Sequence, residues 1–448
     1  MKNIIVRSSW LELAISSSSV LGVRVFGAGL GFVFNVVLAR VLGASGLGVY
    51  QLALTFVLVA SIIARLGMDA AMLRFAATSF AEKDWGSLVT IHKLGMAIVV
   101  LASVPIVTVT YFSADWIAAT CFSNSAIAAP LRLMSLALIP FSLFNLYGEL
   151  LKAGHKQISA SFVQAGALPL VNLCAIYFFA DKLANPAGAA KIYLASTMLV
   201  STLGYVFWKR GVLLPHAAAF KTLKLRELFE VSLPMYLAAL SDVIMTFSDI
   251  LILGIFVTSA ELGIYSAAAR TALLTRFVLL ATSSVVAPKF AALHAAKDYV
   301  NLEKLAVGAT FLTLVSTLPL LMAFILFPDK ILSIFGPTFV IGGPVLMILA
   351  LGQFVNAGTG PVGYLLNMSG HHRIESRIAL SGAMLTIGFC FSLIPFFGII
   401  GAAMASAIAT SVCNLLRVYF VKTRLGINVL PFKMLFGKLK NISQVGNK

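Results

Sequence analysis

The chain has 448 residues, of which 60% are hydrophobic and only 11% are charged. Soluble domains carry about 25% charged residues, so this chain cannot cover a globular surface with polar groups. Its composition excludes a soluble enzyme, a disordered chain and a disulfide-stapled secreted module. Because apolar runs of about 20 residues recur along the whole length, we predict an all-α integral membrane protein.

Twelve apolar segments are each long enough to cross about 30 Å of hydrocarbon as a helix. The first is expected to be a retained span, because no small-residue cleavage site follows a short apolar core. Pro361 stands beside several glycines in the tenth span and predicts a break or hinge there. The spans are expected near residues 16–39, 46–66, 88–112, 128–151, 158–180, 188–208, 232–257, 262–286, 305–327, 341–367, 374–397 and 399–421.

Positive charge is concentrated in alternate loops. Lys2 and Arg7 precede the first span, Lys152 and Lys156 follow the fourth, and a basic stretch at 209–226 follows the sixth. Few basic residues lie on the opposite side, so we predict an even number of spans with both termini in the cytoplasm. The net charge of +17 therefore indicates topology and contact with anionic membrane lipids, and we expect no nucleic-acid partner.

The two halves of the chain resemble each other at an offset of about 215 residues. Six spans per repeat keep the same orientation, so we predict two six-helix lobes related by a pseudo-two-fold axis along the membrane normal, with a central cleft. The expected lobes are residues 1–215 and 216–425, followed by a basic cytoplasmic tail at 426–448. The matches, in chain order, are Leu47-Gly48-Val49-Tyr50 with Leu262-Gly263-Ile264-Tyr265, Lys83-Asp84-Trp85 with Lys297-Asp298-Tyr299, Gly154-His155-Lys156 with Gly370-His371-His372, Gly166-Ala167 with Gly382-Ala383, and Gly188-Ala189-Ala190 with Gly401-Ala402-Ala403.

Two hairpins carry residues that are similar to a known family. Leu38-Ala39-Arg40-Val41-Leu42-Gly43, followed by Gly46-Leu47-Gly48-Val49-Tyr50, resembles the first hairpin of polysaccharide flippases. Asp249-Ile250-Leu251-Ile252-Leu253-Gly254, followed by Leu262-Gly263-Ile264-Tyr265-Ser266-Ala267-Ala268, is similar to their seventh and eighth helices. Over nearly its whole length the chain therefore resembles the O-antigen (Wzx-type) flippases of the multidrug/oligosaccharidyl-lipid/polysaccharide exporter superfamily.

The resemblance implies a transporter of the cell inner membrane, and not an enzyme. Such proteins move undecaprenyl-pyrophosphate-linked oligosaccharide, an O-antigen or exopolysaccharide repeat unit, from the cytoplasmic to the outer leaflet. The two predicted lobes suit alternating access, in which one lobe rocks against the other. We expect a monomer that uses no metal and no other cofactor.

Three arginines inside predicted spans are the candidate substrate-binding residues, because a cation within the hydrocarbon is costly and usually functional. Arg24 lies in the first span, about 12 Å from its start, and the resemblance to lipid-precursor flippases implies that it binds the pyrophosphate. Arg270 and Arg276 lie in the eighth span and would point about 120° apart on an α-helix. The alternatives are that Arg24 snorkels to the interface and that Arg270 pairs with Asp249.

Two aspartates of the seventh span are candidates for ion coupling or for pairing with arginine. Asp242 and Asp249 are seven residues apart, so on an α-helix they lie within about 20° of the same face. They are expected either to take up H⁺ or Na⁺ or to pair with the arginines of the eighth span. Arg65 and Asp69 are four apart and are expected to form an interfacial ion pair.

Other functions stay open beside the flippase. A multidrug/ion antiporter of the same superfamily would require an acidic, aromatic pocket for cationic cargo, and the arginines within the spans argue against it. A peptidoglycan lipid-precursor flippase carries a similar head group, although such proteins often have fourteen spans. A membrane polysaccharide polymerase or ligase is expected to have a large extramembrane loop with acid–base groups, whereas the outer loops here are short.

Overall fold

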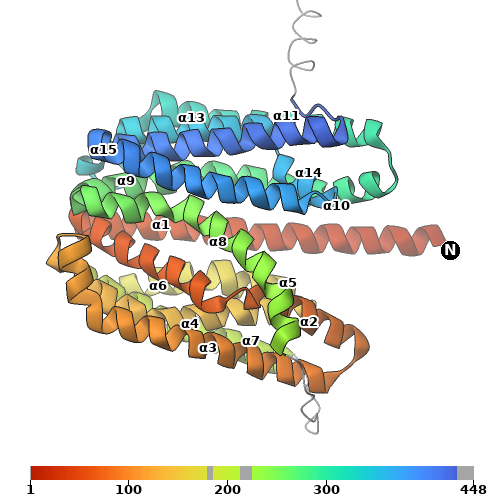
Figure 1. Cartoon of the computed structure of the whole chain (residues 1–448), viewed down its shortest axis with the longest axis horizontal. Coiled ribbons are helices and arrows are strands. Elements are labelled where there is room, and N and C mark those ends of the chain that lie inside the picture. The colour runs from red at the N-terminus through yellow and green to blue at the C-terminus, as the bar shows by residue number, and fades with distance from the viewer. Residues whose placement is uncertain (1, 179–184, 212–224, 431–448) are drawn as a thin grey trace, which may run out of the picture. The chain divides into compact units, whose positions relative to one another are not determined.

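A computed structural model of the chain describes residues 2–178, 185–211 and 225–430. Ten helices in this part of the chain are long and apolar enough to cross a membrane, and the predicted all-α membrane class is confirmed. The predicted tail beyond residue 430 lies outside the described residues. The α-helices (Figure 1) are α1 (Lys2–Arg65), α2 (Met68–Glu82), α3 (Trp85–Trp116), α4 (Ala128–Ala153), α5 (Gln157–Ser161), α6 (Ala167–Phe178), α7 (Pro186–Gly211), α8 (Leu225–Phe256), α9 (Ser259–Ala272), α10 (Arg276–Ala295), α11 (Tyr299–Leu326), α12 (Pro328–Leu332), α13 (Gly343–Thr359), α14 (Val362–Met368) and α15 (His372–Leu425).

Two of the ten helices, α1 and α15, turn back on themselves at a glycine. Gly43 has a φ of 67° and Gly398 a φ of 54°, a conformation that glycine adopts without a steric penalty. Residues 16 apart in a straight helix would be about 24 Å apart, yet the Gln51 amide donates a hydrogen bond to Asn35 across the first turn. An ion pair across the second turn joins residues 42 apart. Each helix therefore supplies two membrane-crossing segments, which raises the ten candidates to the predicted twelve.

The starts of α3 and α11 have the same local structure. In each, a left-handed lysine (Lys83, φ 56°; Lys297, φ 57°) precedes an aspartate, Asp84 or Asp298. Each aspartate accepts a hydrogen bond from the backbone N–H three residues later, at 3.1 Å in both cases, and so caps its helix. An aromatic ring pair spans the same turn, with centroids 6.0 and 5.9 Å apart. Local geometry thus supports the duplication at this point.

The turn from α4 to α5 repeats between α14 and α15. Three backbone hydrogen bonds within residues 150–156 have counterparts within 365–371, each pair related by an offset of 215. The left-handed residue is His155 in the first turn and Gly370 in the second. The structural alignment therefore differs by one residue from the sequence match, which paired the two glycines Gly154 and Gly370. The two-fold relation between the lobes stays a prediction.

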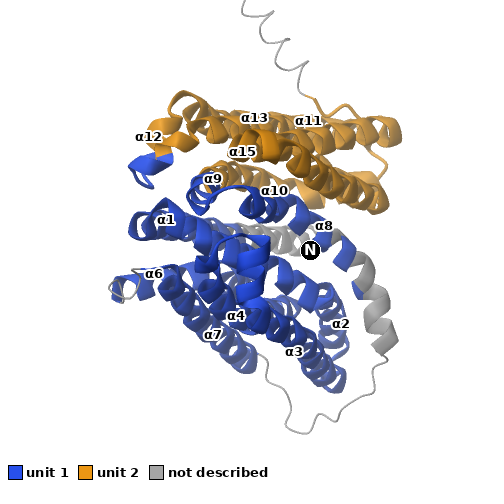
Figure 2. Ribbon diagram, turned by 60° about the vertical axis from the view of Figure 1, so that its left-hand side comes forward, with its two compact units in different colours: residues 1–267, 333–339 blue, residues 268–332, 340–448 orange. Residues whose placement is uncertain are grey.

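Contacts within the chain define two compact units (Figure 2). Unit 1 comprises residues 1–267 and 333–339, and unit 2 comprises residues 268–332 and 340–448. In unit 2, the predicted break at Pro361 is confirmed, because α13 ends at Thr359 and Gly360 has a φ of 69° before α14 begins. The division into lobes at residue 215 stays a prediction.

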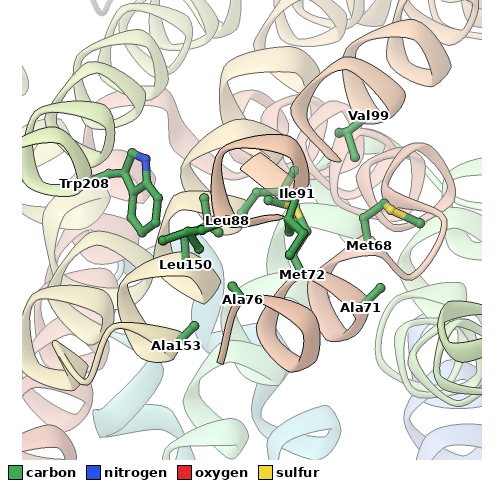
Figure 3. Close-up of a cluster of buried hydrophobic side chains, with 11 residues drawn as sticks. Met68, Ala71, Met72, Ala76, Leu88, Ile91, Val99, Leu150, Ala153 and Trp208 are labelled. Atoms are coloured by element: carbon green, nitrogen blue, oxygen red, sulfur yellow. The ribbon is translucent and has the colours of Figure 1, made fainter. Parts of the chain in front are cut away.

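A cluster of fully buried side chains holds α2, α3, α4 and α7 together in unit 1 (Figure 3). Met72, Leu88, Leu150 and Trp208 are each at most 2% exposed. Gly95 of α3 lies so close to α2 that an added Cβ would be 2.5 Å from the sulfur of Met72. Since lipid tails are as apolar as leucine, this close packing, more than exclusion of water, stabilises helix contacts in a membrane.

The cap of α11 yields a prediction on pH dependence. Hydrogen bonds from the side chain and the backbone of Asn301 lower the pKa of Asp298. A carboxylate with a lowered pKa stabilises the fold above its unfolded value of about 3.9, and that stabilisation is lost as the pH falls through the folded pKa. We expect Asp298→Ala to lower the melting temperature in detergent at neutral pH. The difference in melting temperature between Asp298→Ala and the wild type should shrink below about pH 4. Asp298→Asn, which keeps a hydrogen-bond acceptor, should lower the melting temperature less. A pH-independent difference would contradict this account of the cap.

Candidate functional site

Arg24 lies on α1 with its side chain exposed, and it forms no hydrogen bond or ion pair with any described residue. One turn further along α1, Gly27 crosses the π-helical turn Phe162–Gly166 so closely that an added Cβ would lie 2.4 Å from the carbonyl oxygen of Ala165. Such π-helical turns are frequent at functional sites. Three residues are about 300° of helix, so Arg24 lies within about 60° of the face that makes this crossing.

The eighth span is not one continuous α-helix as expected. A 3₁₀ turn at Leu273–Thr275 separates α9 from α10, with Arg270 before it and Arg276 directly after it. A 3₁₀-helix turns by about 120° per residue, whereas an α-helix turns by about 100°. The three residues of the 3₁₀ turn therefore add about 60° of rotation, and the angle between the two arginines falls from the expected 120° to about 60°. The break thus brings both arginines toward the same side of the span. Arg270 is half-buried and Arg276 is exposed.

Two of the three candidate arginines, Arg24 and Arg276, have no acidic partner in the part of the chain that the structure describes. An arginine near the centre of a membrane helix costs about 2.5–3.5 kcal/mol on insertion scales. A chain that retains such residues without a counter-ion has two cationic groups available for an anion. The convergence of all three arginines on one cavity stays a prediction.

The two aspartates of α8 have different surroundings. Asp249 is 7% exposed, and its carboxylate accepts hydrogen bonds from the Tyr265 hydroxyl and from the backbone N–H of Ile250. Asp242 is exposed, and its carboxylate has no hydrogen-bond or ion-pair partner among the described residues. Because α8 is unbroken between Asp242 and Asp249, the two residues lie on the same face of the helix, as expected. Only Asp249 is held in place by hydrogen bonds from neighbouring groups. Pairing of Asp249 with Arg270 stays a prediction.

The predicted pair of Arg65 and Asp69 is confirmed, with an N–O distance of 2.9 Å. Arg65 ends α1, and Asp69 lies in the first turn of α2. Burial raises the pKa of Asp69, despite the opposing effect of the nearby Arg65 guanidinium. Nearby, Glu149 accepts hydrogen bonds from Lys152 at 2.7 Å and from Gln164 at 2.9 Å. These groups satisfy one another, so they make a structural network and leave no free charge for a ligand.

The sequence analysis missed a second ionic network, in unit 2. Arg417 donates to both oxygens of Glu375 at 3.0 Å and also to Asn414 at 3.2 Å. Asn414 in turn donates to Asn356, and Asn356 to Gln353. In the sequence, Glu375 and Arg417 carry opposite charges and lie at similar separations on either side of Gly398. Only the reversal of α15 at that glycine brings the two side chains together. Within residues 19–430, wherever side chains are described, no group of three His, Cys, Asp or Glu could hold a metal ion.

Comparison with known proteins identifies the family of the chain. Residues 14–294, more than half of the chain, match the family described as "Polysaccharide biosynthesis protein", and residues 234–392 match MatE. Together with the membrane-spanning helices, these matches define a multi-pass transporter and not an enzyme. The chain belongs to the polysaccharide biosynthesis protein family, the flippase branch of the multidrug/oligosaccharidyl-lipid/polysaccharide exporter superfamily, as the resemblance implied.

Individual relatives are distant. The probable low-salt glycan biosynthesis flippase Agl15 of Haloferax volcanii is 24% identical over 422 residues, which are 93% of this chain and 85% of the relative. An inward-facing multidrug resistance transporter of the MATE family matches with a TM-score of 0.78 at 15% identity, covering 92% of this chain and 98% of the other. The lipid II flippase MurJ matches with a TM-score of 0.73 at 15% identity, and the match covers 92% of this chain and 87% of MurJ. These two likenesses show the fold.

The Glu375–Arg417 network yields a prediction on stability. Both side chains are less than a fifth exposed, so removing one partner leaves a buried charge, at a cost of about 3–5 kcal/mol. We expect Arg417→Ala to lower the free energy of unfolding by this amount, measured by unfolding in mixed detergent micelles. The double variant Arg417→Met with Glu375→Leu should recover most of the loss. Equal losses in the single and double variants would show that packing, and not charge, explains the effect.

Proposed function

We propose that the protein flips undecaprenyl-pyrophosphate-linked oligosaccharide, an O-antigen or exopolysaccharide repeat unit, from the cytoplasmic to the outer leaflet by alternating access. The observation that carries the proposal is the pair of arginines, Arg24 and Arg276, in apolar helices without an acidic partner among the described residues. A pyrophosphate brings the missing negative charge. The cost of holding these cations in the membrane is then offset only when cargo is bound.

Arginine suits this cargo better than lysine does. The planar guanidinium offers parallel N–H donors that match two phosphate oxygens, whereas an ammonium is a point charge. We assign Arg24 to the pyrophosphate on the first repeat, and Arg270 with Arg276 to the same group on the second. The 3₁₀ turn between the latter two supports this assignment, because it turns both toward one side of the span.

The relatives support the same class of cargo. Agl15 is described as a probable glycan biosynthesis flippase and MurJ as a lipid II flippase. The polyprenyl tail of such a cargo is apolar and can stay in the bilayer while the protein shields the pyrophosphate and the sugars. We place the protein in the inner membrane as a monomer with both termini in the cytoplasm, in agreement with the basic loops on that side.

One observation favours a second candidate, a multidrug/ion antiporter. Asp242 is an exposed carboxylate in a membrane helix without a partner among the described residues, and a cationic drug would fit such a group. Among the described residues, two arginines without an acidic partner outweigh one aspartate without a basic partner, so we prefer anionic cargo. A peptidoglycan lipid precursor carries the same pyrophosphate and is distinguished from oligosaccharide cargo by its sugar and peptide.

The binding assignment is tested by Arg24→Ala and Arg276→Ala in vesicles that contain fluorescent lipid-linked oligosaccharide. A hydrogen bond to a charged group contributes about 1.5–3 kcal/mol, so we expect each variant to lower the flipping rate at least about tenfold. Arg24→Lys should retain part of the rate. The matched control is Arg74→Ala, which removes an exposed arginine of α2 and should leave the rate unchanged. Normal flipping by both Arg24→Ala and Arg276→Ala would remove these residues from the binding site.

We also propose that Asp249 couples transport to H⁺ or Na⁺. Its burial and its hydrogen bond from Tyr265 hold one carboxylate in a defined place within a membrane helix. Asp249→Asn keeps the shape but cannot exchange a proton or bind a cation, so flipping should lose its dependence on an imposed ion gradient. Asp242→Asn is the comparison on the same helix face. Identical responses of the wild type and Asp249→Asn across a series of pH and Na⁺ gradients would reject this role.

A further inference from the structure

A cavity of about 510 Å³ lies in unit 1, where the loop after α3 meets the turn from α8 to α9. Its volume is within the range of about 300–1,000 Å³ that is usual for small-molecule sites. Phe122 and Phe256 give it aromatic surface. None of the described residues that line the cavity carries a charge, so it offers no counter-charge to a pyrophosphate. Its polar lining residues are Ser45, Ser123, Asn124, Thr258 and Ser259.

Several polar groups of the cavity are available to a ligand. Ser45 and Ser123 are exposed, and their hydroxyls form no hydrogen bond with any described residue. The side-chain amide of Asn124 donates to the Ser259 hydroxyl at 2.7 Å, and its second N–H is left over because an amide nitrogen has two donors. The cavity therefore presents hydroxyl and amide donors, and its hydroxyl oxygens can also accept.

The two segments that form the cavity have a defined local structure. Thr258 and Glu261 cap α9 reciprocally, since the side chain of each accepts a hydrogen bond from the backbone N–H of the other, at 3.3 and 2.9 Å. On the other side, the π-helical turn Ile117–Cys121 ends α3, and the backbone N–H of Asn124 donates to a carbonyl of this turn at 2.9 Å. Ser123 has a φ of 49°, a left-handed conformation that is strained for serine and recurs at ligand sites. These features make the cavity largely preformed, as small-molecule sites are.

Comparison of the two predicted repeats indicates that packing alone does not require a cavity here. The helix α4 begins at residue 128 and α13 at residue 343, which is the offset of 215. At this offset Asn124 corresponds to Phe339. Phe339 is 1% exposed, its ring lies 5.9 Å from that of Phe335, and the ring of Phe335 lies 5.6 Å from that of Phe32. Aromatic rings thus fill the space around the second loop, whereas the first loop has a small amide beside an open volume.

An uncharged sugar ring has the chemistry that this lining matches. A pyranose has C–H groups on its faces, which pack against aromatic rings, and hydroxyls around its edge, which both donate and accept hydrogen bonds. Phe122 and Phe256 can contact such a face, and the free hydroxyl and amide groups can bind the edge. A purely apolar ligand would cover these polar groups without pairing them, which is unfavourable. An anion would find no cation among the described lining residues.

We propose that the cavity is a saccharide site that holds one uncharged pyranose ring. The sugar can come from the glycan of the cargo or from free saccharide outside the cell. The link to the cargo rests on the proposed function, whose topology puts the loop after α3 and the α8–α9 turn on the outer side. The saccharide site itself rests on the cavity. In this arrangement the cavity binds sugar, whereas the assigned arginines bind pyrophosphate.

The first test measures binding of free sugar and so needs no lipid-linked cargo. The probes are the methyl glycosides of glucose, galactose, mannose and N-acetylglucosamine, at up to about 10 mM, so that millimolar binding is detected. Saturation-transfer NMR on the full chain in lipid nanodiscs is the readout. We expect at least one glycoside to bind the wild type, and Ser45→Ala with Ser123→Ala to weaken its binding at least about tenfold, because two hydrogen-bond partners are lost. Absence of binding by every glycoside overturns the proposal, as does equal binding by the double variant.

Two further variants locate the binding in the cavity. Asn124→Phe adds the ring that stands at the equivalent position of the second repeat, so it should fill the cavity and abolish binding. The serine variants keep the bond from Asn124 to Ser259 and so test the same point without altering the loop. The matched control is Ser125→Ala, because Ser125 is exposed in the same loop but does not line the cavity. Unchanged glycoside binding by Asn124→Phe overturns the site.

A control ligand separates a saccharide site from an apolar pocket. Cyclohexylmethanol has a six-membered ring but a single hydroxyl, so it leaves most of the polar groups of the cavity unpaired. We expect it to bind at least about tenfold more weakly than the best glycoside, since a site built to hydrogen-bond hydroxyls rejects an analogue that lacks them. Equal or tighter binding of cyclohexylmethanol overturns the assignment to sugar.

Flipping of lipid-linked oligosaccharide then identifies the source of the sugar. A lower flipping rate for Asn124→Phe, with Ser125→Ala unchanged, assigns the site to the glycan of the cargo, whereas an unchanged rate for both assigns it to free saccharide. Arg24→Ala should bind the glycosides as the wild type does, because the pyrophosphate is assigned to other residues. Glycoside binding by a wild type that flips no lipid-linked oligosaccharide keeps the saccharide site and rejects the proposed function. Flipping without glycoside binding rejects the saccharide site alone.

Discussion

The hydrocarbon of a bilayer offers neither water nor counter-ions, so a charge within it is costly unless it is paired in the protein, reaches the interface or meets a charged cargo. The described part of this chain shows the first solution. Arg65 with Asp69, and Arg417 with Glu375, are paired within the protein at 2.9 and 2.7 Å. Arg24 has no such partner among the described residues. The paired charges hold neighbouring segments together, whereas the proposed function gives Arg24 and Arg276 an anionic cargo as their partner.

The two predicted repeats differ in chemistry at equivalent positions. Tyr50 and Tyr265 are repeat equivalents, and both are fully buried. Tyr50 faces the ring of Phe34, with centroids 6.4 Å apart, whereas Tyr265 donates a hydrogen bond to Asp249, the equivalent of Phe34. One predicted repeat thus has an acid where the other has an aromatic ring. A scaffold built for packing alone would not need this substitution, which supports a functional role for Asp249.

Much of the architecture could be predicted from the sequence because apolar run length and loop charge are local signals. The twelve spans, the glycine-rich hairpin at Gly43 and the Arg65–Asp69 pair all follow from spacing within a few residues. The pair of Glu375 and Arg417 could not be predicted in this way, because it forms only where α15 reverses. The 3₁₀ turn before Arg276 also escaped prediction, since neither glycine nor proline marks residues 270–276, and its effect on the arginine directions is a tertiary property.

The described contacts differ in strength within and between the predicted repeats. The ionic networks around Glu149 and Glu375 each join segments that follow one another in a single repeat, where rigidity lets a bundle move as one body. The first hairpins of the two predicted repeats meet at Gly48 and Gly263, whose backbones are in close contact. The hydrogen bonds at this place, from Asn124 to Ser259 and from Arg40 to Ile334, go to neutral acceptors. The ion pairs therefore stabilise each predicted repeat internally, whereas these contacts between the first hairpins depend on close backbone packing and on weaker, neutral hydrogen bonds.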